Sequence, residues 1–291
     1  MDHPHVTTGG DRHRPAKRRP RRFAGLLVAL LVSAGSAFAL PRHAPVPGGI
    51  AVLRIDGAQA PRVRFNERPQ PVVRERGQWF ALIGIPLDTE PGLLQAHVED
   101  GAARRQLAFA VRPTHYPTQR LRIPDERMVT PPPELAARIE AEQQRLNALK
   151  QHFSPQPEPA TSFVLPAAGR LSARFGVRRV LNGEPRSPHS GLDVAVASGQ
   201  PVRAPAAGTV LAVEDFHFAG RTVVIDHGQG VLTLYAHLSR IDVAVGQQLA
   251  RAARIGSSGA SGRATGPHLH WVVIVGGTSV DPELFLPAAG R

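Results

Sequence analysis

The chain has 291 residues and no cysteine, so it is long enough to bury sizeable cores but has neither a disulfide scaffold nor thiolate chemistry. Its formal net charge of +12 at pH 7 suits an anionic partner such as a cell-wall polymer or lipid headgroups. Nucleic acid is not expected as a partner, because no helix-turn-helix, zinc-knuckle or aromatic-basic signature is present.

Residues 1–39 have the pattern of an export signal. Seven Lys and Arg residues and two Asp residues give this segment a charge of +5, and the apolar run 23–39 ends in Ala37-Phe38-Ala39. That run is 17 residues long, which is shorter than the roughly 20 residues that a spanning helix needs. We therefore predict a signal peptide over 1–39 and an exported protein of the periplasm or cell envelope. Membrane association through an uncleaved N-terminal segment is the alternative.

Residues 40–112 contain short runs with strand character, bounded by turn-forming residues. These runs cover 50–55, 62–65, 72–74, 79–85, 93–98 and 106–111. Runs of this length and spacing predict a small N-terminal β-sandwich. No group of catalytic residue types is visible there, so its expected role is packing or spacing. The alternative is that this domain controls access to a site elsewhere in the chain.

Residues 113–162 form a proline-rich connector. Prolines such as those at 131–133 impose extended backbone and are expected to prevent regular strand pairing up to that point. The segment 134–153 has a helical pattern, and its apolar stripe consists of Leu135, Ile139, Leu146 and Leu149. We predict a connecting helix that docks on one of the domains.

Residues 163–291 are dominated by strand signals, so the whole chain is expected to be mostly β. The predicted strands cover 192–196, 208–213, 222–225, 231–236 and 269–275. Leu192 and Val194 alternate with Asp193, which places the buried face opposite that carboxylate. The segment 256–262 is too rich in glycine for regular structure and is expected to be a loop that forms a cleft wall.

Three histidine-bearing segments follow one another in this region: His189-Ser-Gly-Leu-Asp193, Tyr235-Ala-His237-Leu-Ser239 and His268-Leu-His270. In extended chain, His268 and His270 point to the same face, and residues four apart also share a face. Two imidazoles and one carboxylate suit zinc, with a fourth position left for water or substrate. A single His-x-His or His-x-x-x-Asp is most often incidental, whereas three segments in order favour a metal site.

The remaining histidines of the chain carry no motif. His227 begins a His-Gly-Gln-Gly turn and is expected to be structural, and His217 has no clear role. The histidines at 43, 97, 115 and 152 are expected to face solvent.

Residues 164–287 resemble the lysostaphin/LytM-type zinc metalloendopeptidases, whose signature combines H-x-x-x-D, a histidine in a Y-x-H-L context and H-x-H. The flanking segments 191–195, 202–208, 226–230 and 265–270 also resemble this family. The resemblance implies an antiparallel β-sheet metallopeptidase domain with one Zn²⁺ per chain. It implies that His189, Asp193 and His270 are the zinc ligands. His237 and His268 would then be the two catalytic histidines.

The resemblance further implies a zinc-activated water, with the two histidines transferring protons, and peptidoglycan as the substrate. The bond cut would lie in a stem peptide or a cross-link, with D-alanyl to diaminopimelyl and glycyl bonds both open. The usual His-Glu-x-x-His sequence of many zinc proteases is absent. Some relatives have lost zinc ligands and instead activate an amidase, so a non-catalytic envelope protein that binds peptidoglycan is the alternative. The presence of all five motif residues favours an enzyme.

Overall fold

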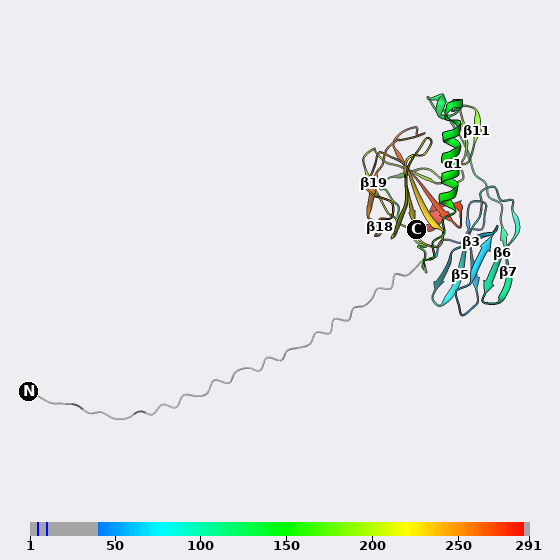
Figure 1. Cartoon of the computed structure of the whole chain (residues 1–291), viewed down its shortest axis with the longest axis vertical. Coiled ribbons are helices and arrows are strands. Elements are labelled where there is room, and N and C mark those ends of the chain that lie inside the picture. Colours follow the sequence, from blue (N-terminus) through cyan, green and yellow to red (C-terminus); the bar gives the residue numbers. More distant parts are fainter. Residues whose placement is uncertain (1–4, 6–9, 11–39, 157, 288–291) are drawn as a thin grey trace, which may run out of the picture. The chain divides into compact units, whose positions relative to one another are not determined.

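The computed structural model describes residues 5, 10, 40–156 and 158–287. Its helices and strands lie in one compact unit, Phe38–Arg291 (Figure 1). The signal peptide predicted for 1–39 lies outside the described residues, apart from His5 and Gly10. Within the described ranges, no helix is both long enough and apolar enough to cross a membrane. The protein is mostly β, as predicted from the sequence.

The first part of this unit consists of two antiparallel sheets. One sheet has the order β1 (Ile50–Ile55), β5 (Gln78–Gly84), β4 (Val72–Glu75), and the other β3 (Arg68–Gln70), β2 (Arg62–Phe65), β6 (Gly92–Asp100), β7 (Ala103–Val111). One hydrophobic cluster takes side chains from both sheets, including Ile83 of β5 and Val98 of β6. This shared core confirms the predicted sandwich. Strand β3 was not predicted, since it is three residues long with a proline at its centre and lies at a sheet edge.

The connector contributes a strand and a helix. Its elements are β8 (Thr118–Leu121), the 3-10 turns η1 (Glu126–Met128) and η2 (Pro133–Leu135), and α1 (Ala136–Lys150). The helix confirms the one predicted for 134–153. The expectation that prolines prevent strand pairing is wrong for β8, which pairs in parallel with β10 (Arg178–Leu181). Its four residues fall between Pro117 and Pro124, so each of them keeps its backbone N–H.

The last part of the chain is built on an eight-stranded sheet. Its order is β18 (Gln248–Leu249), β14 (Gly208–Phe216), β15 (Gly220–Asp226), β16 (Val231–Leu238), β20 (His268–Val275), β12 (Leu192–Ala195), β9 (Arg170–Ala173), and β21 (Thr278–Val280) pairs with β20. Two small sheets accompany it, and a 3-10 turn, η3 (Pro282–Phe285), follows β21. The small sheets have the orders β13 (Pro201–Arg203), β19 (Arg254–Ser257), β17 (Arg240–Ile241) and β11 (Glu184–Arg186), β10, β8. All five strands predicted here are present.

The segment 256–262 begins inside a strand, so the prediction that it lacks regular structure is wrong at its start. Gly256 and Ser257 belong to β19, which pairs with β13 and β17. A Cβ on Gly256 would lie 2.3 Å from the Arg240 carbonyl oxygen, so glycine is what allows β17 to approach. After β19, a single bridge joins Gly259 to His268.

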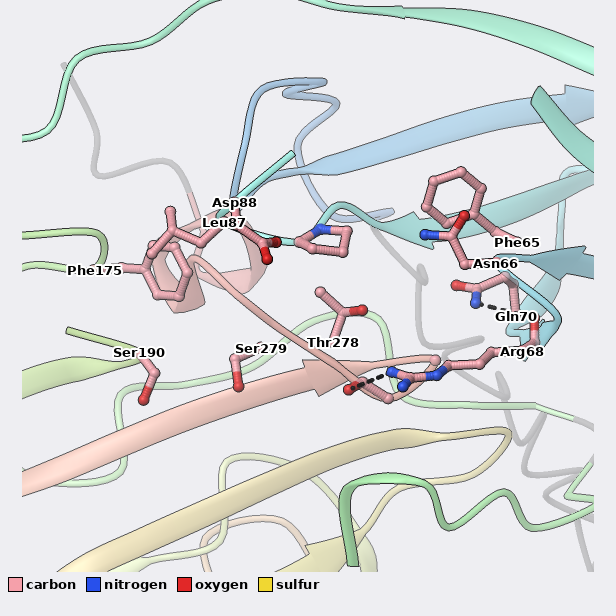
Figure 2. Close-up of a pocket in the computed structure, with 13 residues that line it drawn as sticks. Phe65, Asn66, Arg68, Gln70, Leu87, Asp88, Phe175, Ser190, Thr278 and Ser279 are labelled. Atoms are coloured by element: carbon pink, nitrogen blue, oxygen red, sulfur yellow. Dashed lines mark hydrogen bonds between the residues drawn. The ribbon is translucent and has the colours of Figure 1, made fainter. Parts of the chain in front are cut away.

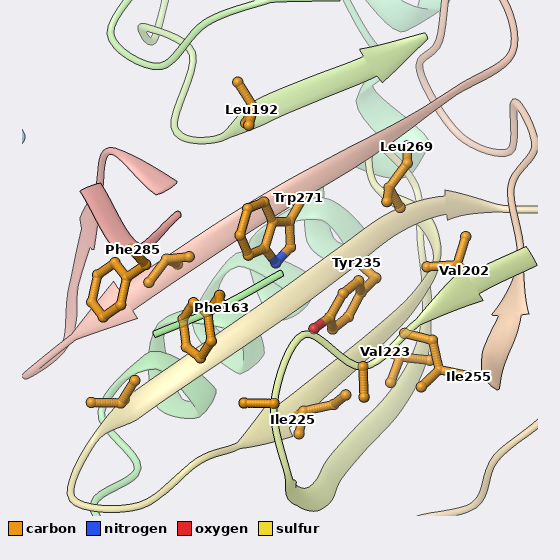
Figure 3. Close-up of a cluster of buried hydrophobic side chains, with 14 of the residues drawn as sticks. Phe163, Leu192, Val202, Val223, Ile225, Tyr235, Ile255, Leu269, Trp271 and Phe285 are labelled. Carbon is orange, nitrogen blue, oxygen red and sulfur yellow. The ribbon is translucent and has the colours of Figure 1, made fainter. Parts of the chain in front are cut away.

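The eight-stranded sheet packs a different cluster on each face. Leu269 and Trp271 of β20 enter a large core with Phe163 and Tyr235 (Figure 3). Val272 enters a second cluster that includes Leu149 of α1, so the helix docks on this sheet. The sequence predicted docking on one of the domains without indicating which one. Because side chains alternate along a strand, His268 and His270 lie on the same face of β20 as Val272.

A cavity of about 510 Å³ lies between the β2–β3 turn and the β20–β21 turn (Figure 2). Arg68 reaches from the first turn to the second and donates a hydrogen bond to the Gly277 carbonyl oxygen at 3.4 Å. None of the five predicted site residues lines this cavity.

Candidate metal centre

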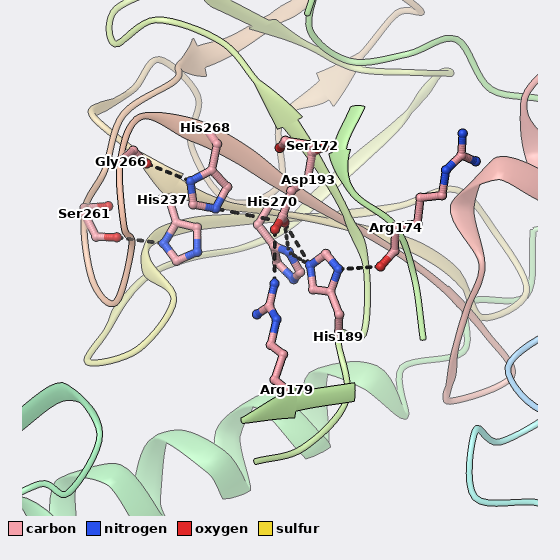
Figure 4. Close-up of polar contacts among 10 residues, drawn as sticks. All are labelled: Ser172, Arg174, Arg179, His189, Asp193, His237, Ser261, Gly266, His268 and His270. Carbon is pink, nitrogen blue, oxygen red and sulfur yellow. Dashed lines mark hydrogen bonds and ion pairs between the residues drawn. The ribbon is translucent and has the colours of Figure 1, made fainter. Parts of the chain in front are cut away.

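Three of the predicted site residues bring their ligand atoms together (Figure 4). His189 Nε2 lies 2.9 Å and His270 Nδ1 2.7 Å from Asp193 Oδ1, and the two nitrogens are 3.0 Å apart. Ligand atoms around tetrahedral zinc are separated by roughly 3.3 Å, given zinc–nitrogen bonds of about 2.0 Å. A small expansion of the triangle would therefore accommodate the ion, and the donor set fits zinc.

Strand pairing explains why these groups converge. Asp193 of β12 is the register partner of His270 of β20, so the two side chains lie next to each other on one face. His189 precedes β12 and donates from Nδ1 to the Arg174 carbonyl oxygen at 2.8 Å, which turns Nε2 and its lone pair toward the other two groups. A Cβ on Gly191 would lie 2.8 Å from His270 Cε1, so the chain between His189 and Asp193 passes close to that ring.

Two of the three candidate ligands are buried, His270 is half-buried, and the charges of the set suit a cation. His189 is 1% exposed and Asp193 6% exposed. Burial by itself would raise the pKa of Asp193, but the adjacent imidazoles of His189 and His270 outweigh it and hold the pKa well below its usual range. Burial lowers the pKa of His270, although Asp193 opposes this change. An anionic carboxylate and neutral imidazoles are the protonation states that bind zinc.

The other two predicted histidines lie beside the ligand set (Figure 4). His237 donates from Nδ1 to the Ser261 carbonyl oxygen at 2.7 Å, and His268 donates from Nδ1 to the Gly266 carbonyl oxygen at 2.8 Å. Their ring centroids are 4.7 Å apart. Since Nδ1 carries the proton in each neutral ring, each Nε2 keeps a lone pair. Burial, with smaller contributions from His270 and His268, lowers the pKa of His237 to about 3 and keeps this ring neutral.

A β-bulge sets the position of His237. Arg221 of β15 pairs with Leu238 of β16, but Val223 pairs with Tyr235, so two residues of β16 stand opposite one residue of β15. His237 is one of these two residues and has a positive φ of 62°. Bulges redirect side chains next to functional sites. The sequence motif identified His237 but gave no indication of the bulge.

Arg179 is a site residue that the sequence reasoning missed. Its guanidinium donates to Asp193 Oδ2 at 3.1 Å, and the side chain is 26% exposed (Figure 4). Arg179 lies on β10, which forms a hairpin with β11 through Asn182 and Gly183, whose φ values are 50° and 90°. An Asn-Gly pair between short strands is a strong hairpin signal, and it could have indicated this element.

Two further histidines are held by hydrogen bonds. His227 is buried, donates from Nδ1 to the Ala207 carbonyl oxygen at 2.7 Å and accepts from Thr233 at 2.8 Å, in agreement with the predicted structural role. His152 was expected to face solvent. Its Nε2 instead lies 3.2 Å from the buried Asp226 carboxylate.

Comparison with known proteins identifies the family. The family model described as peptidase family M23 matches residues 187–282, and the model of the peptidase family M23 N-terminal domain matches residues 43–113. A Pseudomonas aeruginosa protein whose crystal structure is described as that of a peptidase M23 is 40% identical, with a TM-score of 0.71. The match covers 83% of this chain and 94% of that one. The chain belongs to peptidase family M23.

Each of two curated relatives matches less than half of the chain. The peptidoglycan DD-endopeptidase ShyA of Vibrio cholerae is 44% identical over 113 residues, which cover 38% of this chain and 26% of that protein. The DD-carboxypeptidase/endopeptidase Mpg of Neisseria meningitidis is 40% identical over 113 residues, which cover 39% of this chain and 26% of that protein. The chain thus spans about a quarter of the length of these relatives.

Proposed function

We propose that this protein is a zinc-dependent endopeptidase that hydrolyses peptide cross-links or stem peptides of peptidoglycan. The observation that carries the proposal is the convergence of His189 Nε2, Asp193 Oδ1 and His270 Nδ1 beside two further histidines. Membership of peptidase family M23 and the peptidoglycan endopeptidase activity for which the two relatives are named support the same function.

The proposed ligands are His189, Asp193 and His270. Zinc bound there would activate a water molecule and polarise the carbonyl of the peptide bond. The Arg174 carbonyl fixes the ring of His189, and β-sheet pairing fixes Asp193 against His270. The chain thus holds the three ligands in place before an ion binds.

His237 and His268 are the proposed proton-transfer residues. Hydrolysis requires one group that takes a proton from the attacking water and one that delivers a proton to the leaving amine. Backbone carbonyls hold both Nδ1 atoms, so both Nε2 atoms can accept a proton. Both rings have the same type of hydrogen bond, so the assignment of the two roles needs kinetic data.

The proposed location is outside the cytoplasmic membrane, in the periplasm or cell envelope, where peptidoglycan is found. This location depends on the export signal in residues 1–39.

Digestion of purified peptidoglycan sacculi tests the function. The zinc-loaded protein is incubated with sacculi, with and without a chelator, and the released fragments are identified by mass. We expect peptide fragments that no longer appear after chelation. Intact sacculi together with stoichiometric bound zinc would contradict the proposal and favour a non-catalytic protein that activates an amidase.

A further inference from the structure

A group of arginines lies on one side of the proposed metal centre. Arg179 and Arg186 are register partners in the β10–β11 hairpin, so their side chains leave the hairpin on the same face. Arg179 contacts Asp193 Oδ2 at 3.1 Å, which places this face of the hairpin against the ligand set. Figure 4 shows the Arg179 side chain extending from the hairpin toward Asp193.

Arg263 is the third member of this group. It belongs to the loop that precedes β20, where its backbone N–H donates to the Phe218 carbonyl oxygen at 2.8 Å. Its guanidinium carbon lies 4.2 Å from the centroid of the Phe218 ring. Burial lowers the pKa of Arg263, and the positive charges of Arg179 and Arg186 lower it further. The same loop contacts the site through Ser261, whose carbonyl oxygen accepts from His237 Nδ1 at 2.7 Å.

The two hairpin arginines place like charges next to each other, and the contact of Arg179 with Asp193 offsets part of this charge. Like charges that face each other across paired strands repel, and partial burial strengthens the repulsion. Arg186 donates to the Val129 carbonyl oxygen at 2.8 Å, so the connector holds its side chain in place. The Nε atoms of Arg179 and Arg186 are buried and have no hydrogen-bond partner among the described residues. Each of these two side chains thus keeps one N–H group that no described residue satisfies.

We propose that Arg179, Arg186 and Arg263 form a carboxylate-binding subsite that positions the substrate beside the metal centre. This inference rests on the proposed function and narrows its substrate class to peptides with a free carboxylate next to the scissile bond. Guanidinium groups bind carboxylates through paired hydrogen bonds. In a D-alanyl to diaminopimelyl cross-link, the carbon attached to the scissile nitrogen carries such a carboxylate. A glycyl bridge has none, so the subsite selects the first type of bond.

Two soluble cross-linked peptides test the subsite. They differ only in whether the carbon attached to the scissile nitrogen carries a carboxylate or a carboxamide. We expect the zinc-loaded protein to cleave the carboxylate form with the higher kcat/KM. Arg186→Gln and Arg263→Gln should each reduce this preference by roughly 10-fold or more, which is the usual effect of losing a hydrogen bond to a charged group. Arg186→Lys keeps the charge and should retain part of the preference.

Arg178→Gln is the matched control. Arg178 precedes Arg179 on β10, is exposed, and points to the opposite face of the hairpin, so its loss should leave the preference unchanged. Equal cleavage of both peptides, or a preference that survives both glutamine variants, would overturn the subsite while leaving the peptidase function intact.

A binding measurement separates the two proposals if neither peptide is cleaved. Calorimetric titration of each peptide into the zinc-loaded protein then reports the subsite directly. Tighter binding of the carboxylate form that Arg186→Gln and Arg263→Gln both weaken would support the subsite although the peptidase proposal had failed. Equal binding of the two forms would overturn the subsite.

Discussion

His270 and His237 occupy neighbouring positions but differ in their proposed roles. His270 offers one of the three candidate ligand atoms, whereas the ring centroid of His237 lies 6.0 Å from that of His270. We expect His270→Ala to abolish zinc retention, because two ligands remain. His237→Ala should keep zinc and lower turnover by roughly 100-fold to 10,000-fold, the usual effect of losing an acid–base group. Elemental analysis and kcat distinguish the two outcomes.

The control for these variants is His97→Ala, which removes an exposed histidine of the N-terminal sandwich and should change neither quantity. Full activity of His270→Ala or His237→Ala would remove the corresponding role.

The chain passes close to the His270 ring at Gly191. A Cβ there would lie 2.5 Å from the Trp271 carbonyl oxygen and 2.8 Å from His270 Cε1. Gly191→Ala should therefore displace His270, weaken zinc binding, and reduce the free energy of unfolding by about 1–3 kcal/mol. Competition titration with a chromophoric chelator and denaturant unfolding measure the two effects. Gly92→Ala, where nothing lies within 4 Å, should be nearly neutral.

His227 makes stability depend on pH. Burial lowers its pKa to about 4, against an ordinary value of 6.5. Between these values the unfolded chain binds more protons, so stability is highest above pH 6.5 and falls as the pH drops toward 4. The free energy of unfolding should fall by about 3 kcal/mol between pH 7 and pH 4. Denaturant unfolding at pH 7 and pH 4 measures it, and His227→Gln should reduce the difference between the two values. An equal difference in the variant would contradict the assignment.

The helix α1 is held to the central sheet by apolar contacts. Leu149 is 5% exposed and lies in the same cluster as Val272 of β20. Leu149→Ala should lower the free energy of unfolding by about 2–5 kcal/mol. Leu93→Ala removes a leucine that is 70% exposed and should change stability by less than about 0.5 kcal/mol. A similar effect of both substitutions in denaturant unfolding would argue against docking of the helix.

The apolar runs of β16 and β20 predict these strands, and the apolar stripe of α1 predicts the helix. The short strands β2 and β4 are predicted as well, because turn-forming residues bound them. Strands β3, β8 and β13 have no such signal, since their three or four residues carry little periodicity and depend on pairing with distant chain. The bulge at His237 is likewise a property of the pairing between β15 and β16.

The residues of the candidate site also form two groups, those that the sequence identified and those that it did not. His189, Asp193, His237, His268 and His270 stand in short motifs that can be recognised before the fold is known. Arg179 has no motif, and its contact with Asp193 arises only when β10 packs against the ligand set. Arg263 likewise has no motif and lies directly after the segment 256–262, which the sequence identified only as a cleft wall.

At the scale of the whole molecule, the connector does more than separate two domains. Its strand β8 pairs with β10, and its Val129 carbonyl holds Arg186. The hairpin that carries Arg179 thus depends on residues outside the segment matched by the peptidase family M23 model, which begins at residue 187. The domain boundaries at 112 and 162 stay predictions. The contacts of the connector show that the segment between them supports the hairpin formed by β10 and β11.

Anomalous diffraction at the zinc absorption edge, from crystals of the zinc-loaded protein, tests the central claim most directly. We expect one strong peak, at about 2.0–2.2 Å from His189 Nε2, Asp193 Oδ1 and His270 Nδ1. A peak elsewhere, or no peak at this position in a protein that contains stoichiometric zinc, would contradict the proposed metal centre and the hydrolysis assigned to it.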